Sequence, residues 1–528
     1  MRSFLLLLLL VTALQSGAQP LFNLEVVPSN LTVNMPVHSG AFGVYNHKWF
    51  AIGGRNNGMH GFQPPFAFPT SGINNSVYVI DPATNQKWTA DVSSLPDSIR
   101  EAITSSNMEF YLQDSTLYMV GGYGWKDAIQ NFITWPTLTA VNIKGLMNAV
   151  INNQPINSYF RQIQDTTLAI CGAHLQKLDS TYYLVFGHRF DGYYERTDTN
   201  GFHTQVYSEE IRKFRINDDG TNLGIYAYTA LRDTDNFHRR DYNLIPFINA
   251  WKGEGLLAYS GVFRKKIDLP YFNCIEIYPD TIIVRNDFNQ NLSQYHSAVC
   301  PLIDSVNNIN HHLFFGGMSM YFVDSTGATV ADSMVPFVRT ISDVVRDMDN
   351  NYHELNAGIQ MPALLGSNAY FFLDDSVPMY HSRYINFSTC SNRQRIGYIA
   401  GGIESTMQNI STIDPGLSFG SQRVFEVYIN KTPSGIQPQE VTNPVLDFYA
   451  YPNPTHTQSE ISFTLLKPEQ VKVEVLDVTG RLVQVLCDKQ LPSGKQKLLL
   501  DVSTLPKGVY NVAATVNGRV KSIRLVAE

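Results

Sequence analysis

Trp49-Phe50-Ala51-Ile52-Gly53-Gly54 is a short apolar run that ends in two glycines. The same pattern, an apolar segment closed by one or two small residues, returns five times along the chain. The copies are Leu117–Gly122, Tyr183–Gly187, Leu257–Gly261, Leu313–Gly317 and Tyr398–Gly402. The last glycines of the six copies therefore lie at positions 54, 122, 187, 261, 317 and 402. A strand-rich unit that recurs in this way predicts sheets repeated around a common axis.

The composition fits a chain of strands with packed cores. Of the 528 residues, 44% are hydrophobic and 12% aromatic, which excludes an intrinsically disordered protein. The 28 Tyr, 30 Phe and 36 Gly residues favour strands and tight turns over helices. Only 16% of the residues are charged, and 39 basic against 46 acidic residues leave a net charge of −7. Because contacts to phosphates need clustered Lys and Arg, we expect no nucleic-acid partner.

The first copy carries more of the repeated unit. After its glycine pair comes the apolar segment Ser76–Asp81, then the turn Pro82–Asn85, then Trp88. The glycine pair, Tyr78 and Trp88 in this order resemble a Kelch repeat. The resemblance implies one four-stranded blade of a β-propeller for each unit, with the glycines where strands crowd near the axis and the Tyr and Trp between adjacent blades. The later copies keep the glycine element and lose the Tyr and Trp spacing.

We predict an all-β fold in which a six-bladed Kelch-like β-propeller spans residues 19–431. A seventh blade would have to lie between Gly317 and Gly402, and this interval is short for two units. The last unit offers three strands, at Ala369–Leu373, Gly397–Gly402 and Arg423–Asn430. Its outer strand is predicted to come from Phe22–Val27, because pairing the two ends of the domain would remove an open sheet edge.

The N-terminus has the layout of a secretory signal peptide. Met1–Ser3 is a short positive start, and Phe4–Leu14 is an almost unbroken apolar run. The small residues Ser16 and Ala18 occupy the −3 and −1 positions before Gln19. The apolar run of about 11 residues is shorter than the ~20 that cross a bilayer. We expect residues 1–18 to be removed on export and no transmembrane segment in the mature chain.

Five cysteines remain in the exported chain, at positions 171, 274, 300, 390 and 487. An odd number leaves at least one thiol unpaired, and the spacing shows neither a CxxC motif nor a zinc site. Buried free thiols are predicted for most of them. Cys274 with Cys300 is the one pair that we consider for a disulfide bridge.

The C-terminal segment follows a different pattern. Residues 432–446 lack apolar periodicity and are predicted to be a linker. Beyond it, Val471–Val475 alternates between apolar and charged residues, and Asn517-Gly518 is a strong hairpin signal. About seven short strands in residues 447–528 predict a small immunoglobulin-like β-sandwich.

Four motifs in this segment resemble the C-terminal sorting domain of the type IX secretion system. They are Tyr451–Pro454, Asp477–Arg481, Leu505–Tyr510 and the basic end Lys521–Arg524. The resemblance implies that the type IX secretion machinery and a sortase are partners of this domain. It also implies transit through the periplasm and release from the cell or attachment to the outer-membrane surface.

Candidate catalytic and metal-binding groups are sparse. His311-His312 has no second ligand pair at a suitable spacing, so we predict a solvated turn there. Asp343, Asp347 and Asp349 lack the glycine and closing glutamate of a calcium loop, which favours a plain polar turn. No P-loop, nucleophile elbow or HExxH motif is present. We therefore expect no catalytic residue, no metal and no cofactor.

The residues after each glycine element are expected to lead into loops around one concave mouth. The candidate ligand-binding residues in these loops are Arg55, Asn57, Tyr123, Trp125, His188, Arg189 and Arg264. Gly53–Asn57 also resembles the loop by which some eukaryotic Kelch adaptors bind acidic peptides. Arg holds carboxylates with paired hydrogen bonds and aromatic rings supply contact area. The set predicts binding of an extracellular glycan or peptide.

An enzyme is the alternative. Galactose-oxidase-like propellers use a Tyr–Cys crosslink and a copper ion held by Tyr and His, and the composition of this chain permits such a site. Sialate-processing Kelch enzymes rely on Arg with Glu or His at the mouth of the channel. The sequence assigns neither cluster, so we favour binding without catalysis and keep a propeller enzyme acting on sugars as the second hypothesis.

Overall fold

The computed structural model describes residues 22–62, 64–195, 201, 203–410, 415–431, 439–440, 445–465, 468–478, 480–516 and 519–528. The predicted signal peptide, 1–18, and most of the predicted linker, 432–446, lie outside these ranges. The described chain is mostly β, as predicted, and its α-helices are α1 (Asp97–Ile103) and α2 (Ile143–Ile151). No helix in the described ranges is long and apolar enough to cross a membrane.

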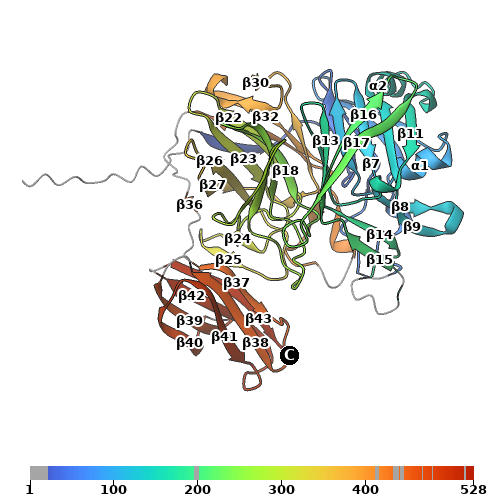
Figure 1. Ribbon diagram of the computed structural model, residues 1–528. Coiled ribbons are helices and arrows are strands. Elements are labelled where there is room, and N and C mark those ends of the chain that lie inside the picture. Colours follow the sequence, from blue (N-terminus) through green and yellow to red (C-terminus); the bar gives the residue numbers. More distant parts are fainter. Residues whose placement is uncertain are drawn as a thin grey trace, which may run out of the picture.

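Antiparallel sheets of four strands dominate the larger part of the molecule, which we call the propeller-like domain (23–430) (Figure 1). The first sheet contains β2 (Ala41–Tyr45), β3 (Lys48–Ile52), β4 (Ser76–Asp81) and β5 (Gln86–Asp91). The second contains β6 (Glu109–Gln113), β7 (Thr116–Val120), β10 (Thr137–Asn142) and β11 (Phe160–Gln164). The third contains β12 (His174–Leu178), β13 (Thr181–Val185), β16 (Glu210–Asp218) and β17 (Leu223–Arg232).

The second half of this domain continues the pattern. The fourth sheet contains β18 (Asn243–Asn249), β19 (Gly253–Tyr259), β20 (Cys274–Ile277) and β21 (Ile282–Arg285). The fifth has β22 (Ala298–Asp304), β23 (Ile309–Phe315), β26 (Thr340–Arg346) and β27 (Tyr352–Gln360), extended by β30 (Met379–Tyr380), β31 (Tyr384–Asn386) and β36 (Gln439–Glu440). The last contains β29 (Tyr370–Leu373), β32 (Arg393–Ala400), β35 (Val424–Asn430) and β1 (Asn23–Pro28).

Smaller sheets form at the end of the domain that follows the glycine elements. The hairpins are β8 (Tyr123–Lys126) with β9 (Asn131–Thr134), β14 (His188–Gly192) with β15 (His203–Tyr207), and β24 (Tyr321–Val323) with β25 (Thr329–Ala331). A three-stranded sheet contains β28 (Leu364–Ser367), β33 (Ile403–Ser405) and β34 (Ser418–Gly420). Figure 1 places the three hairpins at the same end of the domain.

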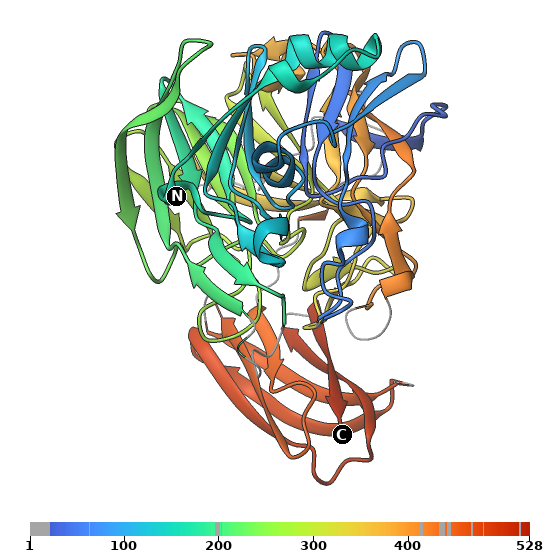
Figure 2. The same cartoon turned by 90° about the vertical axis from the view of Figure 1, so that its right-hand side faces the viewer.

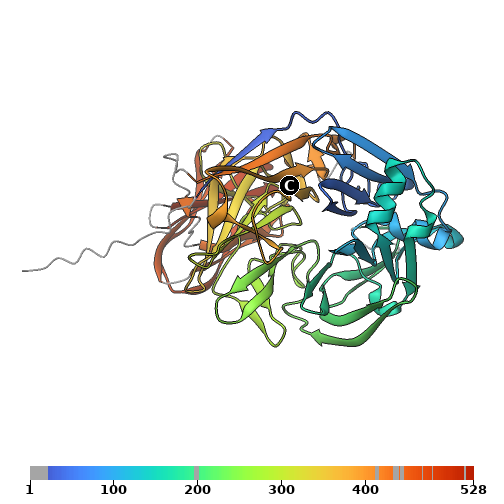
Figure 3. The same cartoon turned by 90° about the horizontal axis from the view of Figure 1, so that it is seen from above.

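The four-stranded sheets surround a common centre (Figure 3). Strands β2, β6, β12, β18, β22 and β29 are innermost, and residues of all of them line a narrow central cavity of about 200 Å³. Each of these strands lies next to the one that follows it in the sequence, and β29 lies next to β2. The arrangement is therefore closed on itself.

Apolar cores fill the spaces between neighbouring sheets. Between the last sheet and the first, Trp49 stacks on Phe372 with ring centroids 4.7 Å apart and meets Tyr398 edge-on. Further clusters join the first sheet to the second and each later pair in turn. The domain is thus a series of sheets packed face to face, each held by both neighbours.

The glycine elements lie where adjacent sheets come closest. Gly121 has φ of +66°, and a Cβ there would lie 2.0 Å from the carbonyl oxygen of Ile170, which precedes the next sheet. Gly53 has φ of +68° and is equally close to the carbonyl of Ile103. Only glycine has both the conformation and the space for these positions. The predicted role of the glycine pairs in close strand approach is confirmed.

The predicted closure by the N-terminal strand is also confirmed. Strand β1 pairs antiparallel with β35 along its whole length, from Asn23 opposite Asn430 to Pro28 opposite Phe425. Figure 3 shows this blue strand beside the orange strands of the last sheet.

The histidine pair was predicted wrongly. His311 and His312 lie inside strand β23, and both are buried. Nδ1 of His311 lies 2.7 Å from a carboxylate oxygen of Asp343, which itself lies inside strand β26 rather than in the predicted polar turn. Nδ1 of His312 lies 2.6 Å from the hydroxyl of Tyr259. Both strand faces are covered by neighbouring sheets, so neither imidazole lies in a solvated turn.

All five cysteines are buried free thiols, as predicted for most of them. The proposed bridge between Cys274 and Cys300 is wrong. Cys274 lies on β20 of the fourth sheet and Cys300 on β22 of the fifth, and each pairs within its own sheet.

The C-terminal domain (445–527) has the seven strands that the sequence predicts. One sheet contains β37 (Val445–Tyr451), β38 (Gln458–Leu465) and β41 (Gly494–Asp501). The other contains β39 (Glu469–Asp477), β40 (Leu482–Leu491), β42 (Gly508–Val516) and β43 (Arg519–Ala527). Residues of both sheets form one apolar core, which continues into the propeller-like domain. Figures 1 and 2 show the two domains packed against each other.

Candidate functional site

A repeated backbone pairing surrounds one end of the central cavity. In each sheet, the residue after the glycine element pairs with the residue that lies three positions before the innermost strand. The pairs are Arg55 with His38, Tyr123 with Ser106, His188 with Cys171, Val262 with Arg240, Met318 with Tyr295 and Ile403 with Ser367. These positions form a collar of twelve residues, and side chains from it approach one another across neighbouring sheets.

Arg55 contacts Asn57, and its side chain is buried rather than presented at an open mouth. Arg55 is only 4% exposed, and its Nε donates a hydrogen bond of 3.1 Å to Oδ1 of Asn57. Its guanidinium also donates to the carbonyl of Pro69 and lies 5.3 Å from the ring centroid of Phe68. Burial lowers the pKa of Arg55 to about 10. Three of its contacts are therefore internal, and the loop conformation depends on them.

Tyr123 and His188 are also buried. The hydroxyl of Tyr123 donates a hydrogen bond of 2.7 Å to the carbonyl of Gly192. Nδ1 of His188 lies 2.8 Å from Nε2 of Gln205 and 3.3 Å from Nη1 of Arg240. Because a guanidinium only donates, Nδ1 accepts and the proton of a neutral His188 lies on Nε2. Burial and the charge of Arg240 hold the pKa of His188 well below its usual value.

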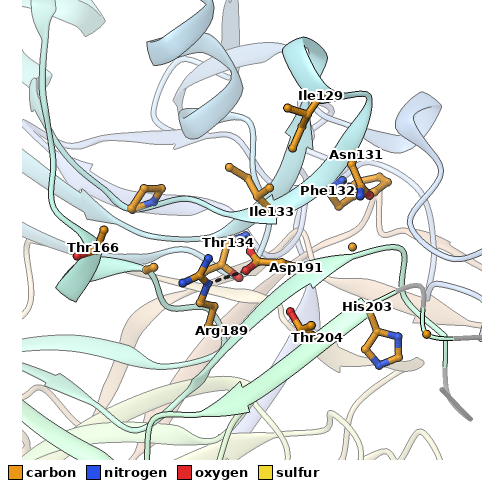
Figure 4. A pocket seen from close by; sticks show the side chains of 14 residues that line it. Ile129, Asn131, Phe132, Ile133, Thr134, Thr166, Arg189, Asp191, His203 and Thr204 are labelled. Atoms are coloured by element: carbon orange, nitrogen blue, oxygen red, sulfur yellow. Dashed lines mark hydrogen bonds and ion pairs between the residues drawn. The ribbon is translucent and has the colours of Figure 1, made fainter.

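Trp125 and Arg189 lie further out, on hairpins β8–β9 and β14–β15. An open pocket of about 410 Å³ lies between these hairpins, and Figure 4 shows Arg189 beside Asp191 on its wall. The Nε of Arg189 lies 2.6 Å from the Asp191 carboxylate, so its charge is already paired. Trp125 donates from Nε1 to Asp127. This pocket is lined mainly by residues of the two hairpins, and a paired cation on its wall leaves little charge to hold a ligand.

Arg264 is placed elsewhere than predicted. Its guanidinium lies 5.2 Å from the ring centroid of Phe272 and 5.6 Å from that of Tyr449, which belongs to the C-terminal domain. It therefore belongs to the contact between the two domains rather than to an open mouth.

The sequence reasoning missed Arg240, which the structure places in the collar. The residue is 9% exposed, and its Nε has no hydrogen-bond partner among the described residues, although the Asp241 carboxylate lies 3.4 Å away. The guanidinium lies 5.1 Å from the ring centroid of Phe263 and 5.8 Å from that of Tyr207. A buried arginine that lacks a hydrogen-bonded carboxylate is costly unless a ligand completes its hydrogen bonds.

Aromatic rings continue from Arg240 in both directions, and we call them the aromatic arc. Successive rings have centroids between 4.2 and 6.4 Å apart or share Arg240 as a neighbour. Its members are Phe68, His60, Tyr194, Phe190, His188, Tyr207, Phe263 and Tyr295. Burial lowers the pKa of His60 to about 4, so this ring is neutral at physiological pH. The arc thus places rings beside two buried cations, Arg240 near Tyr207 and Phe263, and Arg55 near Phe68.

The central cavity beneath the collar is lined by titratable groups that burial keeps neutral. Burial raises the pKa of Glu109 well above its usual value and lowers the pKa values of His174 and His296 to about 3 and about 4. Within the described ranges, no three His, Cys, Asp or Glu side chains form a group that could hold a metal ion.

Comparison with known proteins identifies the C-terminal domain. Residues 449–528 match the family described as "Secretion system C-terminal sorting domain". No curated protein matches this chain. Among solved structures, one titled "Structure of YjhT" shares 9% sequence identity at a TM-score of 0.42, over 74% of this chain and 100% of that chain.

The family match confirms the predicted sorting domain. A domain of this kind implies handling by the type IX secretion machinery, and secretion across the outer membrane or attachment to the cell surface. The match indicates where the propeller-like domain is delivered. The part of the structure that bears on its ligand is the collar.

Proposed function

We propose that the protein is a secreted or surface-attached binding protein that recognises a carboxylate-bearing extracellular glycan or peptide. In this proposal, residues 1–18 are a signal peptide, 19–431 a Kelch-type β-propeller, 432–446 a linker and 447–528 an immunoglobulin-like sorting sandwich. The sortase predicted from the resemblance acts on the last of these.

Six blades are supported by the repeated pairing of the collar. The same two backbone positions recur six times, always one residue after a glycine element and three before an innermost strand. A seventh unit would add a further pair, and the described residues between Gly317 and Gly402 contribute only Met318, which pairs with Tyr295, and Ser367, which pairs with Ile403. Each blade therefore contributes one pair to the mouth.

The observation that carries the binding function is the environment of Arg240. Its guanidinium is buried, incompletely hydrogen-bonded among the described residues, and adjacent to Asp241, which lines the central cavity. A ligand carboxylate can accept two parallel hydrogen bonds from such a group, and removal from water makes that pair stronger than one on the surface. The aromatic arc supplies stacking faces for a sugar ring or an aromatic side chain beside the carboxylate.

The test is an array of glycans and peptides in acidic and neutral forms, probed with the full-length protein. Binding is expected for carboxylate-bearing members and is expected to fall at least about tenfold for their amides, because one charge-assisted pair is lost. Arg240→Met should abolish the preference, while Arg215→Met, at an exposed position on β16 of the third sheet, should not change it. Equal binding of acids and amides would refute the assignment.

A second candidate function is a propeller enzyme acting on sugars. His238 stacks on Tyr207 of the aromatic arc at 3.7 Å, and its Nδ1 lies 3.0 Å from the carboxylate of Glu209. An imidazole placed by a carboxylate beside a ligand site is suited to general acid–base chemistry. Turnover of any sugar on the array that is lost in His238→Gln would favour the enzyme, and metal analysis of the purified protein would test the galactose-oxidase-like version.

A further inference from the structure

The C-terminal domain is joined to the propeller-like domain by strand addition. Strand β25 pairs parallel with β43, with Val330 opposite Ser522 and Ala331 opposite Ile523. The hairpin β24–β25 thereby becomes part of the C-terminal domain's sheet, whose order is β24-β25-β43-β42-β39-β40. Main-chain pairing of this kind is a common way for one protein to bind the exposed sheet edge of another. Without the hairpin, β43 would be an open edge strand.

A buried lysine marks the same contact. Lys521 on β43 is 1% exposed, and its ammonium lies 4.1 Å from the ring centroid of Tyr321 on β24. The hydroxyl of Tyr321 in turn donates a hydrogen bond of 3.0 Å to the carbonyl of Phe448 in the C-terminal domain. Burial raises the pKa of Glu354 to about 8, and the charge of Lys521 acts against this shift. Lysine is almost never fully buried unless nearby groups stabilise its charge. Here the ring of Tyr321 and the carboxyl group of Glu354 lie near the ammonium of Lys521 and stabilise it.

Polar contacts continue along the edge of the contact. Nδ2 of Asn453 donates a hydrogen bond of 3.0 Å to the hydroxyl of Ser333, which follows β25. Arg524 lies 3.8 Å from the carboxylate of Asp332. Together with the approach of Arg264 to Tyr449, these three contacts link two segments of the C-terminal domain, around β37 and on β43, to the propeller-like domain.

The interior of the contact is apolar and continuous. One core cluster contains buried side chains of both domains. From the propeller-like domain it includes Leu269, Phe272, Leu292, Met318, Met320, Tyr321, Val335 and Phe337. From the C-terminal domain it includes Phe448, Tyr449, Val473, Val512, Ile523 and Leu525. Exposing such a surface to water would be unfavourable, since each large apolar side chain gains roughly 1.5–3 kcal/mol on burial.

We propose that the C-terminal domain is a docked cap on the glycine-element end of the propeller-like domain, held by this contact rather than by the connecting chain. Cutting the chain between residues 431 and 445 therefore does not separate the two domains. The cap has a structural role in addition to sorting: it completes the edge of hairpin β24–β25 and covers the apolar surface around Phe272. Release of the sorting domain requires the contact itself to open.

The experiment inserts a protease recognition sequence between Glu440 and Val445 of the full-length chain, so that β36, which pairs with β27, stays on the propeller-like fragment. The chain is cut there, and the products are separated by size-exclusion chromatography. The two fragments are expected to elute together in a one-to-one ratio. Separate elution of two folded fragments would overturn the proposal.

Matched substitutions locate the contact. Lys521→Glu places a carboxylate beside Tyr321 and Glu354 and should make the cut fragments separate. Lys489→Glu, at an exposed position on β40 at the opposite edge of the same sheet, should leave them together. Separation of both variants, or of neither, would contradict the assignment to Lys521.

A cross-link tests docking without relying on a destabilising variant. Val330→Cys with Ser522→Cys joins directly paired positions, whose Cα atoms lie about 5 Å apart as a disulfide requires. Val330→Cys with Arg524→Cys is out of register by two positions. The first pair is expected to oxidise at least about tenfold faster than the second. Equal rates would show that the two strands are not paired in solution, and would overturn the proposal.

Discussion

Nη1 of Arg240 lies 3.3 Å from Nδ1 of His188, so an arginine that precedes the fourth sheet contacts a histidine that follows the glycine element of the third. The contact fixes the tautomer of the neutral imidazole and holds the guanidinium beside it, one residue before Asp241, which lines the central cavity. The third and fourth sheets are thereby joined at the point where we propose the ligand to bind.

A substitution at Arg240 distinguishes the contribution of its charge to ligand binding from that of its hydrogen-bond geometry. Arg240→Lys keeps a cation and loses the planar pair of donors, so we expect affinity for a carboxylate ligand to fall about tenfold or more while the fold persists. Isothermal titration with the best acidic array ligand measures the change, and thermal unfolding checks the fold. Unchanged affinity in the lysine variant would show that the guanidinium does not contact the ligand.

We expect the side chain of Arg55 to stabilise the fold rather than to bind a ligand. Arg55→Ala leaves the carbonyl of Pro69 and the amide of Asn57 without their buried donor, which should cost about 1–3 kcal/mol of unfolding free energy. Urea unfolding measures this loss. Arg189→Ala, with a side chain 58% exposed, is the control and should change stability by less than about 0.5 kcal/mol. Equal stabilities of the two variants would mean that the Arg55 contacts contribute nothing.

A methyl group at Gly121 should be poorly tolerated. Its Cβ would lie 2.0 Å from the carbonyl oxygen of Ile170 and the backbone has a positive φ, so Gly121→Ala is expected to destabilise the protein by about 3 kcal/mol or more. Gly224 has an ordinary φ and no atom within 4 Å of the place that a methyl group would take, so Gly224→Ala is the control. Differential scanning calorimetry should show a lower midpoint for the first variant alone.

Acid should destabilise the fold through its buried histidines. Burial lowers the pKa of His312 to about 3, whereas the unfolded chain takes up the proton near pH 6.5. The contribution of neutral His312 to the unfolding free energy is therefore fully present above pH 6.5 and is lost as the pH falls toward 3. Between pH 7 and pH 5 this loss amounts to about 2 kcal/mol. His312→Gln should reduce the change in unfolding free energy between pH 7 and pH 5 by that amount. His456→Gln, at an exposed position, should leave the slope unchanged.

The thiols offer a simple check of the cysteine assignment. Burial raises the pKa values of Cys171, Cys274 and Cys300, so their thiolates are scarce in the folded protein. A thiol reagent should label few or none of the five in the native state and all five after unfolding without reductant. A count of three in the unfolded protein would reveal a disulfide.

The fold was largely predictable because the pattern that indicates it, the glycine element, lies within a short stretch of sequence. A glycine pair after an apolar strand marks a backbone conformation that other residues rarely adopt, so Gly53 and Gly121 reveal the repeat without any knowledge of distant contacts. The pairing of Phe22–Val27 with the last sheet followed from counting strands in the final unit.

The candidate site was only partly predictable. Arg55 follows a glycine element and was predicted to bind a ligand, but its contacts are internal. Arg240 precedes a strand, and only its position three residues before that strand, which recurs in every sheet, could have indicated it. Arg264 follows a glycine element too, but a domain far along the chain covers it, and no local pattern reports such docking. His311 and His312 were misplaced because their burial depends on side chains from other strands.

The pairing of β1 with β35 determines when the last sheet of the propeller-like domain can fold. Asn23 meets Asn430, so the first strand of the domain to be synthesised stays unpaired until almost the whole domain has followed it. Contacts between such distant segments form slowly, and a waiting strand can pair with other chains. Strand β1 is therefore made well before its partner strand β35. During this interval the edge of β1 is exposed, and a chaperone that holds unfolded chains can bind it.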